Sequence, residues 1–228
     1  LLFDRAFVAG SFRRAWQERR GYYLALASTW ILLGFLLSTG LSSRNVGFGL
    51  GVSSLTYALA ESEAVPLYLR LALWPHPLSI DYGPQMPSGL GAVWFPAVIL
   101  TMLLTTTLVV WIRWPRVGFV AAAFFLILAP TSSIVPVALQ PMAENRVYLP
   151  LVAVAVLLAL AARALLRHRA PLLLALLAAP LAVATFQRNA QLHDLPATWR
   201  QAIACRPQNV RAWENYAAAL CLENRFAE

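Results

Sequence analysis

An acid and a base stand two residues apart in the stretch PMAENRVYLP, residues 141–150, which separates two long apolar runs. Arg146 carries a planar guanidinium group that suits bidentate binding of a phosphate. Glu144 can orient that guanidinium or contact an acceptor, and Tyr148 can add a hydroxyl donor. The same side chains can instead form a local surface ion pair and an aromatic anchor at a membrane interface. The stretch therefore predicts either a phosphate-binding group or a helix-end anchor.

Two charged residues further upstream also have two interpretations. Arg70 can contact a lipid phosphate, but snorkelling of its long side chain at an interface explains it equally well. Asp81 can lie near an acceptor as a candidate catalytic acid, or it can cap a turn with Tyr82 and Gly83. The sequence holds no Ser–His–Asp set, P-loop or dinucleotide fingerprint. Its two cysteines, Cys205 and Cys221, form no CxxC pair, so we expect no metal site built by this chain.

The elements that must position these residues are apolar helices. Hydrophobic residues make up 60% of the chain and charged residues 12%, with a mean hydropathy of +0.63, which is typical of a polytopic membrane protein. Because lipid leaves backbone groups unsatisfied, such segments must be helical. The predicted fold is therefore all-α, with five spans at residues 22–39, 93–112, 117–139, 147–166 and 170–187.

Arginine-rich segments fix the predicted orientation. All 18 basic residues are arginines, and they concentrate in the segment before the first span, in RWPR at 113–116, and around RHR at 167–169. The positive-inside rule places these three segments in the cytoplasm. Residues 140–146 then lie on the opposite face, where residues 64–75 form an interfacial helix. Glu61 and Glu63 can cap this helix, and Pro66 suits its first turn. No basic stripe interleaves with aromatic residues, so we expect no nucleic-acid partner.

The composition changes after the last predicted span. We divide the chain into a basic cytoplasmic segment (1–21), a transmembrane domain (22–187) and a polar, amphipathic helical segment (188–228). In this last segment, Trp199, Ala202 and Pro207 follow the spacing of a tetratricopeptide repeat, and Trp213 and Tyr216 fit the opening of the next repeat. The alternative is an ordinary amphipathic helical hairpin. More repeats should follow, because one and a half cannot bury a solenoid core.

Taken together, these stretches resemble a known family. YLRLALWPHPLSIDY at 68–82, APTSSIVPVALQPMAENRVYLPLVAV at 129–154 and the repeat onset at 199–220 are similar to the transmembrane and tetratricopeptide-repeat O-mannosyltransferases. That family belongs to the GT-C glycosyltransferases, which use polyprenyl-phosphate sugars. The resemblance covers the C-terminal half of the membrane region and implies a main catalytic acid in an external loop upstream of this chain. The catalytic residue is therefore unknown here, and this piece alone should be inactive.

Two classes of function remain. The resemblance implies a membrane glycosyltransferase that moves a sugar, mannose, from a polyprenyl-phosphate donor to a protein hydroxyl on the non-cytoplasmic side. Arg146, Glu144, Tyr148 and Arg70 would bind substrate, and the repeats would recruit the acceptor protein. Metal participation stays open, and no other cofactor is evident. The alternative is a non-enzymatic, membrane-anchored repeat scaffold for protein assembly. The arginine-only basic content indicates a GC-rich bacterial genome, hence an inner membrane with periplasmic repeats.

The orientation can be tested by cysteine accessibility. A single cysteine at any of residues 113–116, in a chain lacking Cys205 and Cys221, should react with a membrane-impermeant reagent only after the cytoplasmic side is opened. The positive-inside rule gives this expectation. Labelling of these positions from the outside would overturn the predicted topology.

Overall fold

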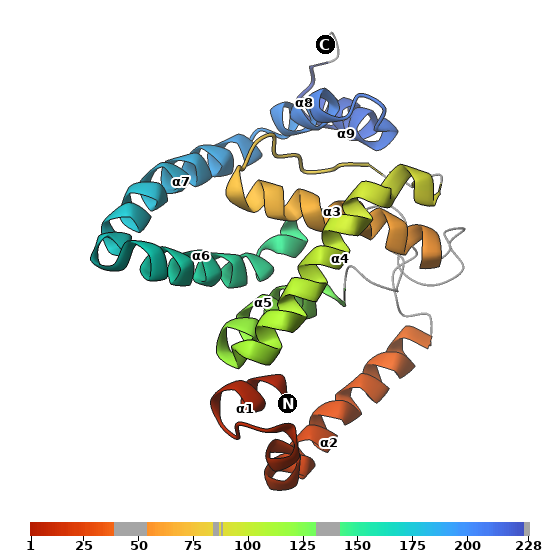
Figure 1. Cartoon of the computed structure of the whole chain (residues 1–228). Coiled ribbons are helices and arrows are strands. Elements are labelled where there is room, and N and C mark those ends of the chain that lie inside the picture. Colours follow the sequence, from red (N-terminus) through yellow and green to blue (C-terminus); the bar gives the residue numbers. More distant parts are fainter. Residues whose placement is uncertain (39–53, 84–86, 88, 131–141, 226–228) are drawn as a thin grey trace.

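The computed structural model describes residues 1–38, 54–83, 87, 89–130 and 142–225, and every element in this part of the chain is helical (Figure 1). The α-helices are α1 (Leu2–Phe7), α2 (Phe12–Ser38), α3 (Ser54–Leu73), α4 (Leu90–Arg113), α5 (Pro115–Leu128), α6 (Pro150–Leu166), α7 (Ala170–Leu192), α8 (Leu195–Cys205) and α9 (Val210–Leu222). Two 3₁₀ turns, η1 (Glu144–Val147) and η2 (Arg167–Arg169), precede α6 and α7. The all-α prediction is confirmed.

Two stretches are long and apolar enough to cross a membrane. They are Val93–Arg113 within α4 and Pro150–Leu192, which comprises α6, η2 and α7. Large apolar side chains remain exposed on these helices, as expected where lipid takes the place of a protein core. The helix α5 has 14 residues, which is short for a span, and residues 131–139 of the predicted third span lie outside the described part of the chain.

The helix predicted at 64–75 is longer than expected. It begins at Ser54 and carries Pro66 in its interior, so Glu61 and Glu63 are helical residues and not caps. Its buried side chains follow a helical spacing, at Tyr57, Ala60, Ala64, Tyr68 and Leu71. That stripe packs against α4 and the core, and the resulting burial outweighs the hydrogen bond that Pro66 cannot make.

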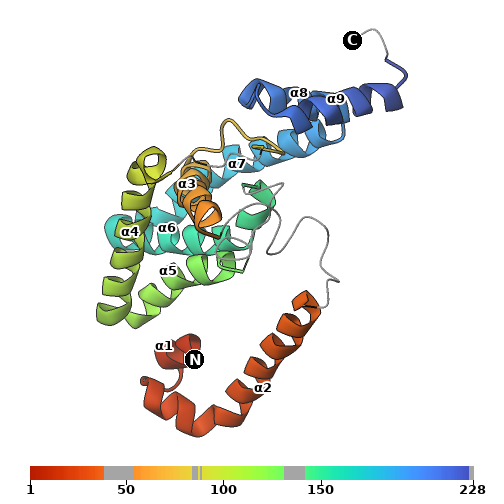
Figure 2. The ribbon, with the colours of Figure 1, turned by 90° about the vertical axis from the view of Figure 1, so that its right-hand side faces the viewer.

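The core lies where α3, α5 and the start of α6 meet. Val65 and Tyr68 of α3 pack with Phe124 and Leu128 of α5 and with Ala153 of α6. The helices α4, α5 and α6 pack in sequence, each against the next, whereas α2 packs chiefly on α1 and stands apart from α4 and α5 (Figure 2). The chain thus forms a helical body with an N-terminal helix pair beside it.

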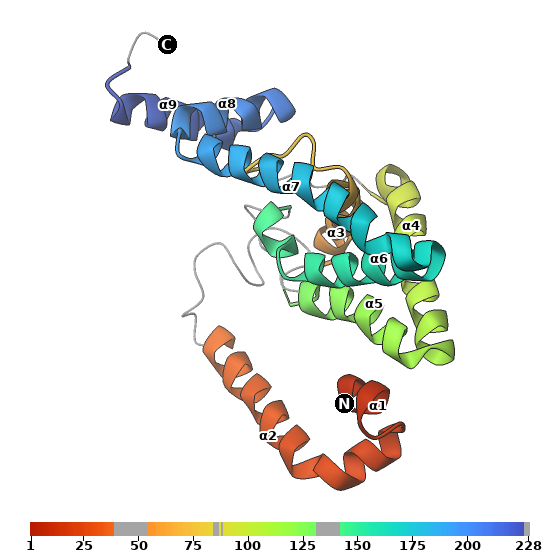
Figure 3. The same ribbon diagram turned by 90° about the vertical axis from the view of Figure 1, so that its left-hand side faces the viewer.

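The segment after residue 187 forms a helical hairpin. The helix α7 continues to Leu192, and α8 and α9 then pack against each other over its end (Figure 3). Asp194 and Asn209 cap the two helices, with side-chain oxygens that accept hydrogen bonds from the N–H groups of Ala197 and Ala212. This arrangement is expected both for the onset of tetratricopeptide repeats and for an ordinary amphipathic hairpin, so it fits the two alternatives equally.

The close contact between α4 and α5 gives a stability prediction. A Cβ added at Gly118 would lie 2.2 Å from the Cα atom of Trp111, so Gly118→Ala must push the two helices apart. We expect a loss of about 1–3 kcal/mol, the usual range for overpacking. The midpoint of thermal unfolding in detergent measures it.

Gly34→Ala is the matched control, because nothing lies within 4 Å of the Cβ added at this position near the C-terminal end of α2. The helix propensity of alanine should leave that variant unchanged or stabilise it by up to about 1 kcal/mol. Equal midpoints for the two variants would contradict the described packing of α4 on α5.

Candidate functional site

The loop of residues 74–83, between α3 and α4, lies at the centre of the candidate site. It runs between α3 and the α8–α9 hairpin (Figure 1). Its polar groups are bonded on one side to η1 and on the other side to α9. This 74–83 loop therefore brings together side chains that are far apart in the sequence.

Glu144 of η1 forms hydrogen bonds with two residues of the 74–83 loop. Its Oε1 atom accepts hydrogen bonds from the N–H of Ser79 at 2.6 Å and from the hydroxyl of Tyr82 at 2.7 Å. Its Oε2 atom lies 4.0 Å from the guanidinium of Arg188, near the end of α7. Burial, followed by the hydrogen bond to Glu144, raises the pKa of Tyr82 well above its ordinary value. The Tyr82 hydroxyl therefore stays protonated and remains a donor.

Arg146 turns toward α3. One of its Nη atoms lies 3.4 Å from the Oε1 atom of Glu61 and 3.3 Å from the hydroxyl of Tyr57. The side chains of Arg146 and Glu61 are only 10% and 5% exposed, so this ion pair is largely withdrawn from water. Glu144 and Arg146, two residues apart in sequence, thus bond to different segments of the fold.

A tyrosine of α3 fixes the backbone just before η1. The hydroxyl of Tyr68 accepts a hydrogen bond from the N–H of Ala143 at 2.9 Å. Burial raises the pKa of Tyr68 to about 12. Since Ala143 precedes Glu144 directly, this bond helps to set the direction in which η1 presents its two charged side chains.

Asp81 joins the loop to the hairpin. Its Oδ2 atom accepts from both Nε and Nη2 of Arg211 in α9, at 2.7 and 2.6 Å, while its Oδ1 atom accepts from the N–H of Gly83 at 3.0 Å. Gly83 has φ +74°, which favours glycine, so the sequence there suits the tight turn. Asp81 is fully buried. Asp81 thus lies in a turn and bonds to Gly83, as the turn-capping interpretation expects. It also forms an ion pair with Arg211 of α9, which that interpretation did not include.

The remaining candidates lie outside this group. Tyr148 is 77% exposed, and Arg70 is also exposed. Among the described residues, neither has a hydrogen bond or ion pair to Glu144, Arg146 or Asp81. We refer to the residues that are brought together at η1 as the polar cluster: Tyr57, Glu61, Tyr82, Glu144, Arg146 and Arg188.

Several of these residues escaped the sequence analysis. Glu61 was expected to cap a helix, and Arg188 and Arg211 were not singled out. The sequence did carry one signal that could have identified them. Charged residues are rare in this chain, and a charged side chain next to an apolar run needs a partner when it is buried. In the described part of the chain, no three His, Cys, Asp or Glu side chains are placed to hold a metal ion.

Neither protein-family models, nor curated proteins, nor solved structures gave a match to the chain.

The Asp81–Arg211 pair should govern how firmly the hairpin is held. Replacing Arg211 by Met leaves a buried carboxylate without its guanidinium, and we expect a loss on the order of 3 kcal/mol. The unfolding midpoint in detergent measures the loss, and faster trypsin cleavage after Arg200, within α8, would report release of the hairpin.

Arg225→Met serves as the control, since the Arg225–Glu223 pair is exposed on both sides. Such a pair contributes about 0–1 kcal/mol. If both variants lose the same stability, Asp81 does not hold α9 as described.

Proposed function

We propose that this chain is part of an integral membrane glycosyltransferase that transfers mannose from a polyprenyl-phosphate donor to a protein hydroxyl on the non-cytoplasmic side. In this proposal the chain contributes five membrane spans and the onset of a tetratricopeptide-repeat solenoid in the bacterial periplasm. One observation carries it: two arginines and two carboxylates gather at the end of the apolar α6–α7 pair.

The connection of α6 and α7 explains this gathering. Arg146 lies just before α6 and Arg188 near the end of α7, while η2 joins the opposite ends of the two helices. The far corner carries Arg167, His168 and Arg169. The polar cluster thus lies at the end of the helices that we assign to the non-cytoplasmic face, at the depth of lipid phosphates.

A leaving polyprenyl phosphate needs positive charge, and the cluster can supply it. Arg146 and Arg188 are 10% and 16% exposed, and a guanidinium so shielded binds an anion more strongly than one in water. In the proposed mechanism, the phosphate replaces Glu61 or Glu144 as partner of an arginine. The released carboxylate is then available to orient the acceptor or the other arginine.

The α8–α9 hairpin also has a role in the proposed mechanism. The Asp81–Arg211 pair ties α9 to a loop that Glu144 also holds. A polypeptide bound by the repeats would therefore be kept at a fixed position relative to the polar cluster. This supports the assignment of the repeats to acceptor recruitment.

One observation favours the alternative, a non-enzymatic membrane-anchored scaffold. The carboxylates of Glu61 and Asp81 are buried and are bonded to arginines of this same chain. Such pairs can have a purely structural role: Glu61–Arg146 holds α3 against η1, and Asp81–Arg211 holds the hairpin against the 74–83 loop. The hairpin surface is then left to bind assembly partners.

Sugar transfer by the intact protein separates the two functions. With a polyprenyl-phosphate mannose donor and an acceptor peptide, Arg146→Gln combined with Glu61→Gln should reduce transfer about 10- to 150-fold, which corresponds to the 1.5–3 kcal/mol of a charge-assisted hydrogen bond. The double variant leaves no buried charge alone, so its unfolding midpoint should stay close to the wild-type value.

Arg163→Gln is the control, because Arg163 is exposed in the last turn of α6, at the opposite end of that helix from Arg146. It should keep nearly full activity. Unchanged transfer in the double variant would remove Arg146 from the mechanism, and absence of transfer by the wild-type protein with any polyprenyl-phosphate sugar would favour the scaffold.

A further inference from the structure

A second group of arginines lies far from the polar cluster, around α1, which contacts both the first turns of α2 and the α4–α5 corner. Exposed arginines come from two of these elements: Arg13, Arg14 and Arg20 from α2, and Arg113 and Arg116 from the corner. We call this the N-terminal basic surface. Its two acids, Asp4 and Glu18, are each bonded to an arginine, Asp4 to Arg19 and Glu18 to Arg14.

Aromatic contacts hold the three elements together. The rings of Phe3 and Phe7 in α1 pack edge-on against Phe119 of α5, with centroids 5.7 and 5.5 Å apart. The guanidinium of Arg5 lies between Phe12 and Trp111, 4.6 and 5.1 Å from their ring centroids. The N-terminal segment is thus fixed against the end of α4, so the arginines of the first turns of α2 and those of the α4–α5 corner lie on neighbouring elements.

The backbone of α2 changes direction within this surface. Arg19 leaves the helical conformation, with φ −133° and ψ 22°, and separates a charged first part of α2 from its apolar continuation. The first part carries Arg13, Arg14 and the exposed Trp16. A charged helical segment joined by a bend to an apolar helix has the form of an element that lies along a membrane surface.

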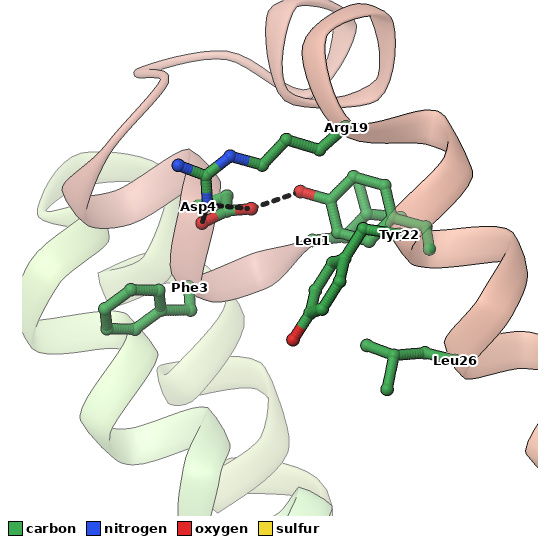
Figure 4. Close-up of a pocket in the computed structure, with 7 residues that line it drawn as sticks. Leu1, Phe3, Asp4, Arg19, Tyr22 and Leu26 are labelled. Atoms are coloured by element: carbon green, nitrogen blue, oxygen red, sulfur yellow. Dashed lines mark hydrogen bonds and ion pairs between the residues drawn. The ribbon is translucent and has the colours of Figure 1, made fainter.

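The aromatic side chains and a cavity indicate what this surface contacts. Phe3, Phe7, Phe12, Trp16 and Trp114 are all more than 40% exposed beside the arginines. Between α1 and α2 is a cavity of about 610 Å³, in which Phe3, Tyr22 and Leu26 provide apolar walls (Figure 4). The Asp4 carboxylate, bonded to Arg19 and to the Tyr23 hydroxyl, forms its polar edge. Apolar walls next to a polar edge fit an acyl chain below a headgroup, and they do not fit an acidic peptide.

We propose that the N-terminal basic surface binds anionic phospholipids. The arginines contact the headgroup phosphates, the exposed aromatic rings enter the boundary between headgroups and acyl chains, and the cavity takes part of one chain. Each arginine near an anionic bilayer surface contributes about 1 kcal/mol, equivalent to about fivefold in affinity. Binding therefore depends on the charge of the lipid as well as on its apolar part.

The experiment uses the detergent-purified chain titrated with dioctanoyl phosphatidylglycerol or dioctanoyl phosphatidylcholine, with binding followed by native mass spectrometry. The wild-type protein should prefer phosphatidylglycerol, and the preference should fall with salt. Arg13→Gln combined with Arg20→Gln should weaken phosphatidylglycerol binding about 10-fold or more, in line with the loss of one charge-assisted hydrogen bond to the headgroup phosphate. Glycerol 3-phosphate and a polyglutamate peptide should compete poorly.

The matched control is Arg167→Gln combined with Arg169→Gln, which removes the same charge from the exposed η2 corner. It should leave the lipid preference nearly unchanged. Equal binding of both lipids, an equal loss in the two double variants, or full competition by glycerol 3-phosphate or by polyglutamate would overturn the proposal.

A measurement on the wild-type chain tests the proposal without any variant, so it is informative even if the arginine variants fail to fold. Phosphatidylglycerol with a photoreactive headgroup, reconstituted with the protein in nanodiscs, should crosslink to residues 12–20 and 113–117. Crosslinks confined to residues 163–169 would equally overturn the proposal.

Discussion

The arrangement of this chain depends on the cost of burying a carboxylate. Glu61 and Asp81 are almost fully withdrawn from water, and an isolated buried charge is strongly unfavourable. Each is paired with an arginine from a distant segment, Glu61 with Arg146 and Asp81 with Arg211. The first pair joins α3 to η1, and the second joins the 74–83 loop to α9. Charge pairing thus sets the positions of elements whose apolar faces can pack in many ways.

The same pairing shapes the proposed chemistry. An arginine that already has a carboxylate partner is held in place before a phosphate arrives, so little side-chain entropy is lost on binding. The phosphate must, however, displace that carboxylate. Binding is then an exchange of one anion for another inside a shielded site, and it releases a carboxylate close to the donor.

The helices that consist of long apolar runs were the elements best predicted from the sequence. Residues 93–112, 147–166 and 170–187 lie almost wholly within α4, α6 and α7, because long apolar runs leave no alternative to helix. The sequence predicted α3 poorly, since Glu61 and Pro66 suggested a helix start, whereas a buried stripe from Tyr57 to Leu71 determines the helix. The cluster residues Glu144 and Arg146 were recognised, but Arg188 and Arg211 were missed, because pairing across more than forty residues is set by tertiary packing.

The central claim is that the polar cluster exchanges a carboxylate for a lipid phosphate, and binding of a sugar-free polyprenyl phosphate tests it most directly. Calorimetric titration of the wild-type protein should show binding, and Arg146→Gln combined with Glu61→Gln should weaken it about 10-fold or more, in line with the loss of one charge-assisted hydrogen bond. Equal binding by the wild-type protein and the double variant, with both folded, would contradict the account.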